Sequence, residues 1–159
     1  MHNKPLRFAI IGNDYQALKS MAIQRVMDHL KQRGAEVWID RPYYYFLTKV
    51  LNLDIPCTGV FDEYNFDVDF VISLGGDGTF LKAANRAGAK EIPIIGINMG
   101  RLGFLADILP AEVEQALDEV YSGDYQVEEH TVIMMETDGE PLEGSPYALN
   151  DIALLKRDN

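Results

Sequence analysis

Short apolar runs alternate with stretches of helical spacing over the first 120 or so residues. The runs are rich in Val, Ile, Leu and Phe and bounded by charged, Gly or Pro residues, and they lie at residues 7–11, 36–39, 70–74 and 92–97. Continuous apolar runs of this length are typical of strands in a parallel sheet that is covered on both faces. Strand, helix and strand in succession form βαβ units with right-handed crossovers. The pattern predicts an α/β fold with a doubly wound, mostly parallel, Rossmann-like sheet.

The intervening segments repeat their apolar residues at i, i+3, i+4 and i+7, as helices do. The first predicted helix ends at Gly34, the second begins at Pro42, and the fourth runs from Pro110 to Ser122-Gly123. The second places Tyr43, Phe46, Leu47 and Val50 on one face. Its three adjacent tyrosines, Tyr43 to Tyr45, invite stacking on a base, but we expect core packing with one or two rings in solvent. Residues 52–67 are interpreted as a surface connection with solvated acids.

The most informative stretch runs from Phe70 to Leu81, with the sequence FVISLGGDGTFL. An apolar strand breaks on three glycines within four residues, and helical spacing then resumes at Phe80. A strand, a glycine turn and a helix N-terminus leave free backbone N–H groups beside a bare loop, which suits a phosphate group. The stretch matches neither the Walker loop nor the dinucleotide fingerprint.

Asp77 stands inside this loop, although a carboxylate repels phosphate. It is either a cap for the helix that begins at Gly78 or Thr79, or the partner of a hydroxyl group or a metal ion. A hydroxyl to be deprotonated beside a phosphoryl group to be transferred indicates a kinase. A second glycine-bearing loop, residues 98–105, follows the strand at 92–97; such loops at strand C-termini are where open α/β sheets bind ligands, although two ordinary loops would look the same.

The pattern changes near residue 124. Residues 127–135 and 147–155 are β-prone, Asp138-Gly139 is a turn signal, and no helical spacing lies between them. We therefore expect an α/β nucleotide-binding domain at residues 1–123 and the beginning of an all-β domain at 124–159. A hairpin this small is marginal alone, which predicts that the sequence is the first part of a longer protein.

Composition narrows the class. The net charge of −11 over 159 residues argues against non-specific binding to nucleic acid or anionic membranes. One cysteine, Cys57, fits a reducing compartment, no apolar run reaches membrane-spanning length, and the N-terminus lacks a signal-peptide core, so we expect a cytoplasmic protein. The three histidines are scattered and show no transition-metal spacing, so no metal ligands are assigned.

Three motifs in this order resemble those of bacterial NAD kinases, the ATP/polyphosphate-NAD kinase family. They are Gly75-Gly76-Asp77-Gly78-Thr79-Phe80-Leu81, the loop at residues 98–105, and Asn150-Asp151 after Tyr147-Ala148-Leu149. The first motif is shared with diacylglycerol and sphingosine kinases and with 6-phosphofructokinases. The resemblance covers the whole chain. It implies transfer of the γ-phosphoryl group of ATP, or of polyphosphate in some members, to the 2′-hydroxyl of the adenosine ribose of NAD, with a divalent metal, expected to be Mg²⁺.

The resemblance also implies roles for residues. Asp77 matches the proton acceptor, with Gly78 beside the ligand. Phe104 matches an aromatic near the adenine, and Asn150 and Asp151 match the pair that holds adenine and ribose. Lys82, one turn into the helix, either meets a nucleotide phosphate or is simply solvated. The candidate nucleotide-binding residues are therefore Gly75, Gly76, Gly78, Thr79, Lys82, Phe104, Asn150 and Asp151.

Two departures from the family pattern matter. Where many members have an arginine after paired acids, this chain has Glu128-Glu129-His130. Family members also continue for over a hundred residues, so we expect these 159 residues to be inactive alone and the full-length protein to be a homo-oligomer with small-molecule partners only. The alternatives are a lipid kinase with the same first motif and a non-catalytic nucleotide-binding fragment.

Overall fold

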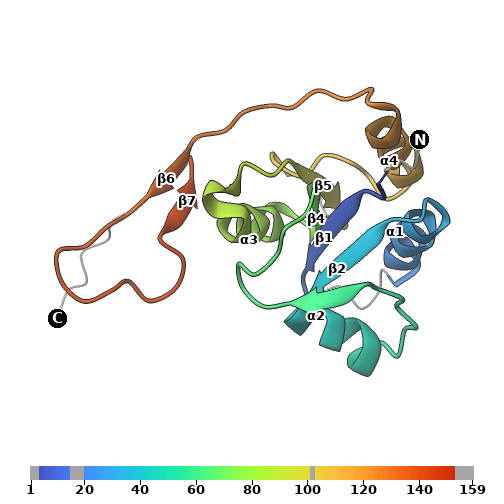
Figure 1. Cartoon of the computed structure of the whole chain (residues 1–159), viewed down its shortest axis with the longest axis horizontal. Helices are drawn as coiled ribbons and strands as arrows, with labels where there is room; N and C mark the ends of the chain where they lie inside the picture. Colours follow the sequence, from blue (N-terminus) through green and yellow to red (C-terminus); the bar gives the residue numbers. More distant parts are fainter. Residues whose placement is uncertain (1–3, 15–19, 101–102, 153–159) are drawn as a thin grey trace.

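The computed structural model describes residues 4–14, 20–100 and 103–152. Its centre is a five-stranded parallel sheet in the order β3-β2-β1-β4-β5 (Figure 1). The strands are β1 (Arg7–Gly12), β2 (Glu36–Asp40), β3 (Gly59–Phe61), β4 (Phe70–Gly75) and β5 (Ile94–Asn98). The apolar runs therefore became parallel strands, which confirms the predicted α/β class.

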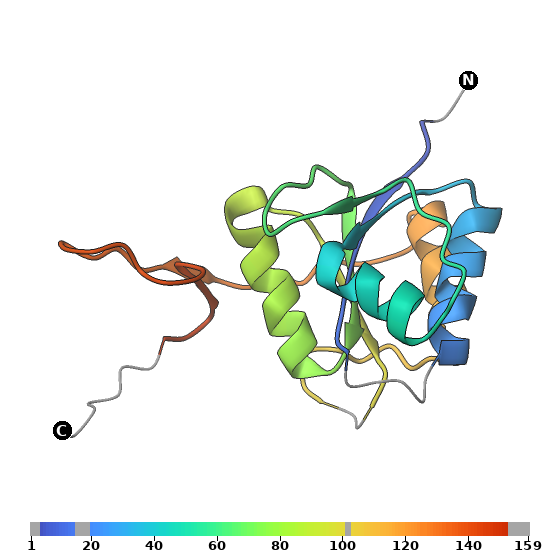
Figure 2. The same cartoon turned by 90° about the horizontal axis from the view of Figure 1, so that it is seen from below.

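Helices cover both faces of the sheet. They are α1 (Ser20–Gln32), α2 (Arg41–Tyr45) with its π-helical continuation η2 (Phe46–Val50), α3 (Asp77–Ala87) with the 3-10 turn η3 (Gly88–Lys90), and α4 (Val113–Ser122). In Figure 2, α1 and α4 lie on one side of the sheet and α3 lies on the other. This placement on two faces confirms the doubly wound architecture.

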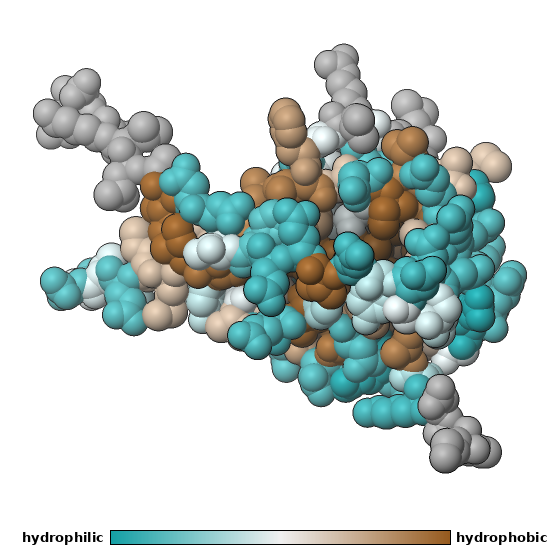
Figure 3. Space-filling model, turned by 90° about the horizontal axis from the view of Figure 1, so that it is seen from above, coloured by the Kyte–Doolittle hydropathy of each residue, from teal (hydrophilic) through white to brown (hydrophobic). Residues whose placement is uncertain are grey.

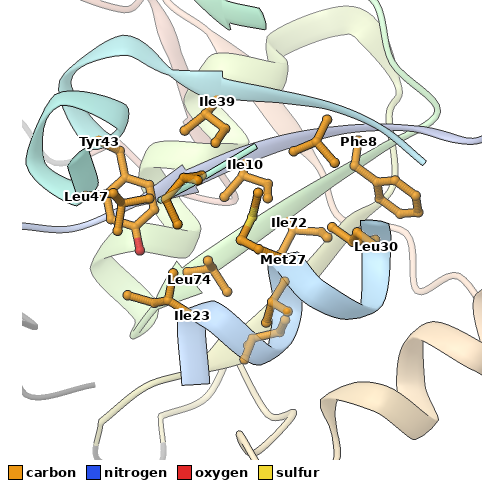
Figure 4. Close-up of a cluster of buried hydrophobic side chains, with 14 of the residues drawn as sticks. Phe8, Ile10, Ile23, Met27, Leu30, Ile39, Tyr43, Leu47, Ile72 and Leu74 are labelled. Atoms are coloured by element: carbon orange, nitrogen blue, oxygen red, sulfur yellow. The ribbon is translucent and has the colours of Figure 1, made fainter. Parts of the chain in front are cut away.

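Alternate residues of the strands face different helices. Phe8, Ile10 and Ile72 belong to the cluster that α1 and α4 cover, whereas Ala9, Ile11 and Val71 belong to the cluster on the other face. Figure 4 shows Ile23, Met27 and Leu30 of α1 directed at the first of these clusters. Each of these side chains is at most 2% exposed, and burying one contributes about 1.5–3 kcal/mol. The predicted helical face of α1 is thus its buried face.

The interpretation of residues 52–67 as a solvated connection is wrong in part. This segment contains β3, which pairs with β2, and it buries Ile55, Phe61 and Phe66. Two of its acids also form ion pairs, Asp62 with Arg41 and Asp67 with Arg7. A three-residue edge strand leaves almost no periodic signal in a sequence, and its acids find partners only across the sheet.

The helix after β2 follows the prediction except at its end. Tyr43, Phe46 and Leu47 are buried, and Tyr45 is exposed, so core packing of the tyrosines is confirmed with one ring in solvent. Val50, placed on the buried face by its spacing, is 57% exposed. The chain there has π-helical geometry, so the spacing of an α-helix no longer applies.

Beyond α4 the chain forms a hairpin of β6 (Val132–Met134) and β7 (Tyr147–Leu149), which pair antiparallel. These strands are shorter than the β-prone stretches, and residues 153–159 of the second stretch lie outside the described residues. The hairpin projects beside α3, where the Tyr147 ring packs on Gly88 (Figure 2). Apolar surface is exposed on this projecting arm (Figure 3), with Val132 and Met134 among the exposed side chains.

Among the described helices, none combines the length and the apolar character needed to cross a bilayer.

Candidate active site

The loops that follow β1, β4 and β5 meet at one edge of the sheet. Chain order reverses between β1 and β4, so this edge contains the topological switch point at which open α/β sheets bind ligands. A cavity of about 470 Å³ opens there. Its lining comes from the loop after β1, from α2 and η2, and from the first turns of α3: Gly12, Asn13, Asp14, Pro42, Tyr43, Tyr45, Phe46, Val50, Gly78, Thr79 and Lys82.

The glycine turn between β4 and α3 forms one side of this cavity. Gly75 must lack a side chain, because a Cβ there would overlap with the buried Thr79 side chain. Gly76 and Gly78 have open space where a Cβ would stand, so the backbone is bare. The first N–H groups of α3 have no partner inside the helix, and a bare backbone lets a phosphate group approach them. This turn has the form predicted for anion binding.

Asp77 is the first residue of α3 and does not cap the helix. Its carboxylate instead accepts hydrogen bonds from the backbone N–H groups of Phe104 and Leu105, both at 2.9 Å, and of Ala106 at 3.3 Å. These bonds, that of Phe104 foremost, lower the pKa of Asp77 below its ordinary value, so the group is ionised at neutral pH. Capping, the structural alternative for this residue, is therefore wrong: Asp77 connects the two glycine-bearing loops.

The second loop is anchored at both ends. Asn98, buried at the end of β5, donates to the backbone oxygen of Ala106 at 3.1 Å and accepts from the N–H of Gly100 at 2.8 Å. Residues 101–102 lie outside the described part of the chain. Phe104 is 100% exposed, so the aromatic ring that the sequence assigns to adenine stands free of the protein core. The loop thus presents one aromatic side chain over a fixed backbone.

Lys82 does not extend into solvent as an isolated charge. Its Nζ lies 2.8 Å from Oδ2 of Asp40, which ends β2 and is completely buried. Arg86, one turn further along α3, lies 3.9 Å from the other oxygen of the same carboxylate. Two cations on one helix face therefore share one buried anion at the C-terminal edge of the sheet.

A second cavity, of about 410 Å³, lies beside α3 on the side of the hairpin. Its lining is Glu63, Tyr64, Gly78, Leu81, Lys82, Asn85, Arg86, Gly144 and Ser145. Gly78 and Lys82 line both cavities. The first turn of α3 is therefore the wall between two spaces that meet at the glycine motif.

Asn150 and Asp151 lie away from this turn. Both are exposed at the end of β7, and Asn150 has a left-handed backbone with φ of 64°. The Asn150 amide is 3.4 Å from the His130 ring, and the N–H groups of both residues bond to backbone oxygens of the hairpin. The structure brings Gly75, Gly76, Asp77, Gly78, Thr79 and Lys82 together with Phe104, and leaves Asn150-Asp151 on the hairpin.

Sequence reasoning missed two charged residues at this site, Asp40 and Arg86. Their only signal was positional: Asp40 ends a predicted strand, and Arg86 follows Lys82 by four residues, which places both cations on one helix face.

Comparisons with known proteins agree with this geometry. Residues 8–125 match the family model described as the ATP-NAD kinase N-terminal domain. An NAD kinase of Bacteroides fragilis is 53% identical over 154 residues, which cover 97% of this chain and 53% of that protein. An NAD kinase of Thermococcus kodakarensis is 38% identical over 152 residues, 94% of this chain and 51% of the relative. The chain spans about half the length of these curated relatives.

A solved structure shares the fold. The crystal structure of yeast NADH kinase complexed with NADH aligns with a TM-score of 0.69 and 19% identity, over 93% of this chain and 47% of that one.

Proposed function

This chain belongs to the NAD kinase family, whose N-terminal domain it contains, and on that premise we propose that the protein converts NAD to NADP. It transfers the γ-phosphoryl group of ATP to the 2′-hydroxyl of the adenosine ribose. The observation that carries the proposal is the position of Asp77, an ionised carboxylate beside a bare glycine turn at which two cavities meet.

The donor occupies the cavity at the end of β1 and β4, with its phosphates at the N-terminus of α3. Gly76, Gly78 and Thr79 offer backbone N–H groups there, and Gly75 allows the turn to close on Thr79. Lys82 borders the same cavity and contacts a phosphate oxygen. Asp14, which also lines it, is the carboxylate that can face Mg²⁺ carried by the donor phosphates; no group of three His, Cys, Asp or Glu side chains gathers elsewhere in the described residues.

Asp77 accepts the proton of the 2′-hydroxyl. The hydroxyl oxygen bonds to the γ-phosphorus, the bond from that phosphorus to the β–γ bridging oxygen breaks, and ADP leaves. Oδ2 accepts only the Phe104 N–H among the bonds described, so it keeps a lone pair for the substrate. Because the pKa of Asp77 is lowered, the carboxylate is a weak base and takes the proton late in the reaction. Most of the rate then comes from positioning and from neutralising phosphate charge.

On this proposal the acceptor NAD meets Phe104 through its adenine, and Asn150 and Asp151 contact adenine and ribose. An amide can donate to and accept from an adenine edge, and a carboxylate accepts from a ribose hydroxyl. The proposal keeps an α/β domain at residues 1–123 and a β-rich domain from 124. It also keeps polyphosphate as a possible second donor, a cytoplasmic location, which the single cysteine fits, and a homo-oligomeric full-length protein.

The test is substrate choice. The protein is incubated with ATP, Mg²⁺ and one of NAD, diacylglycerol or fructose 6-phosphate, and the phosphorylated product is identified by mass spectrometry. We expect NADP from NAD and no product from the other two acceptors. An Asp77→Asn variant run in parallel measures the background. Phosphorylation of the lipid or the sugar without any NADP would overturn the proposal.

A further inference from the structure

Asp40 is a completely buried carboxylate whose partners come from one face of α3. Oδ2 receives the hydrogen bond from Lys82, whereas Oδ1 has no hydrogen bond within the described residues and faces Arg86 at 3.9 Å. Nη1 of Arg86 is likewise buried without a hydrogen-bond partner there. A buried charge carries a desolvation cost that only well-formed bonds offset, so this arrangement is poorly suited to stability alone.

The exposed end of the arrangement is at the site. Asp40 has no accessible surface, but the Lys82 side chain is 37% exposed and borders both cavities, and Arg86 borders the second. Two cations on one carboxylate leave a local surplus of positive charge. The chain as a whole carries −11, which repels a polyanion such as a nucleoside triphosphate at long range. A held cation at the shared wall supplies the local attraction that the overall charge does not.

We propose that Asp40 is a positioning residue for phosphoryl transfer: it holds the Lys82 ammonium at the wall between the two cavities, where it contacts the phosphate that passes from donor to acceptor. This inference rests on the proposed function. Asp40 touches no substrate and acts through Lys82. Without this anchor a lysine side chain has many rotamers, and fixing it before the substrate binds lowers the entropy lost in the transition state.

The test is a double-mutant cycle on turnover with NAD, ATP and Mg²⁺. Asp40→Asn keeps the shape and removes the charge that holds Lys82, so kcat should fall by about tenfold while the KM for ATP changes little. Lys82→Met should also slow turnover, and adding Asp40→Asn to it should slow it no further. Equal losses from Asp40→Asn with and without Lys82 would overturn the inference, because Asp40 would then act through general structure, and so would an unchanged kcat in Asp40→Asn.

A binding measurement separates this inference from the proposed function. Titration of inorganic triphosphate in a calorimeter requires no turnover; Lys82→Met should weaken binding by about tenfold or more, the loss of one charge-assisted contact. Unchanged triphosphate affinity in Lys82→Met would refute the phosphate contact, whereas absence of NADP formation by the unaltered protein would refute the proposed function instead. Asp69→Asn is the control, because it removes a carboxylate paired with Arg7 near the opposite edge of the sheet.

Folding of the variants is followed by thermal unfolding. If Asp40→Asn does not fold, Asp40→Glu keeps the charge and moves the carboxylate by one methylene, and the same dependence on Lys82 is expected of it.

Discussion

The carboxylate of Asp77 occupies the space that a side chain on Gly103 would need, because a Cβ on Gly103 would overlap with Oδ1 of Asp77. The two residues come from different glycine-bearing loops, 26 positions apart in the chain. Their contact explains why the second loop needs a glycine beside its aromatic residue. It also explains how the base and that loop hold each other in place.

Gly103→Ala should displace the Asp77 carboxylate and the loop together. We expect turnover to fall by about 10²-fold, since misplacement near 1 Å has that effect, and stability to fall by about 1–3 kcal/mol. Turnover and urea unfolding measure the two effects. Gly139→Ala is the control, because a Cβ there meets open space, and it should change neither quantity. Full activity in Gly103→Ala would show that the Asp77 position is not critical.

Asp77→Asn tests the chemical role of the carboxylate. Asparagine keeps the size and one oxygen for the backbone N–H groups but accepts no proton, so turnover should fall by about 10² or more while the Kd for NAD stays nearly unchanged. Calorimetric titration of NAD and initial rates separate the two. A large drop in melting temperature with a small drop in turnover would mean that Asp77 mainly fastens the second loop.

The lowered pKa of Asp77 predicts a pH dependence of stability. A group whose pKa is lower in the folded state stabilises the fold above its unfolded value, near the ordinary 3.8, and loses this effect as pH falls through the folded value. The gap in melting temperature between the unaltered protein and Asp77→Asn should therefore be constant above about pH 5 and shrink below pH 4. Parallel curves down to pH 3 would contradict the hydrogen bonds from Phe104 and Leu105.

Asn150 separates a ligand contact from a backbone requirement. Its φ of 64° strains most side chains but not glycine. Asn150→Gly should raise the KM for NAD and keep the melting temperature nearly unchanged, because it removes the amide and preserves the conformation. Asn150→Ala should raise the KM equally and also lower stability by about 1–2 kcal/mol. An unchanged KM in both variants would exclude the amide from NAD binding.

Gly12→Ala tests the donor cavity. A Cβ there would overlap with the Tyr43 ring, which lines that cavity, so the KM for ATP should rise while the KM for NAD stays nearly constant. Gly59→Ala is the matched control: its Cβ would crowd the Trp38 ring in the same way, and neither residue lines a cavity. It should lower stability without changing the KM for ATP. Equal kinetic effects from both variants would argue against a donor in this cavity.

Much of the fold could be predicted from the sequence, because its signals are local. The apolar run at Phe70 and the helical spacing of Ile23, Met27 and Leu30 each encode an element within a few residues, and the glycine motif marks the turn between strand and helix. Burial of a whole face then follows from the pattern, since water excludes apolar side chains regardless of which neighbour covers them.

Tertiary structure alone decided the partners. The sequence identified Asp77 and Lys82, but not that the first accepts N–H groups from Phe104 and Leu105, nor that the second pairs with Asp40 from another strand. It also missed β3, whose three residues become a strand only because β2 offers an unpaired edge. The physical reason is range. Hydrophobic periodicity is set within one element, whereas hydrogen bonds and ion pairs depend on distances of about 3 Å between elements that only the packed fold brings together.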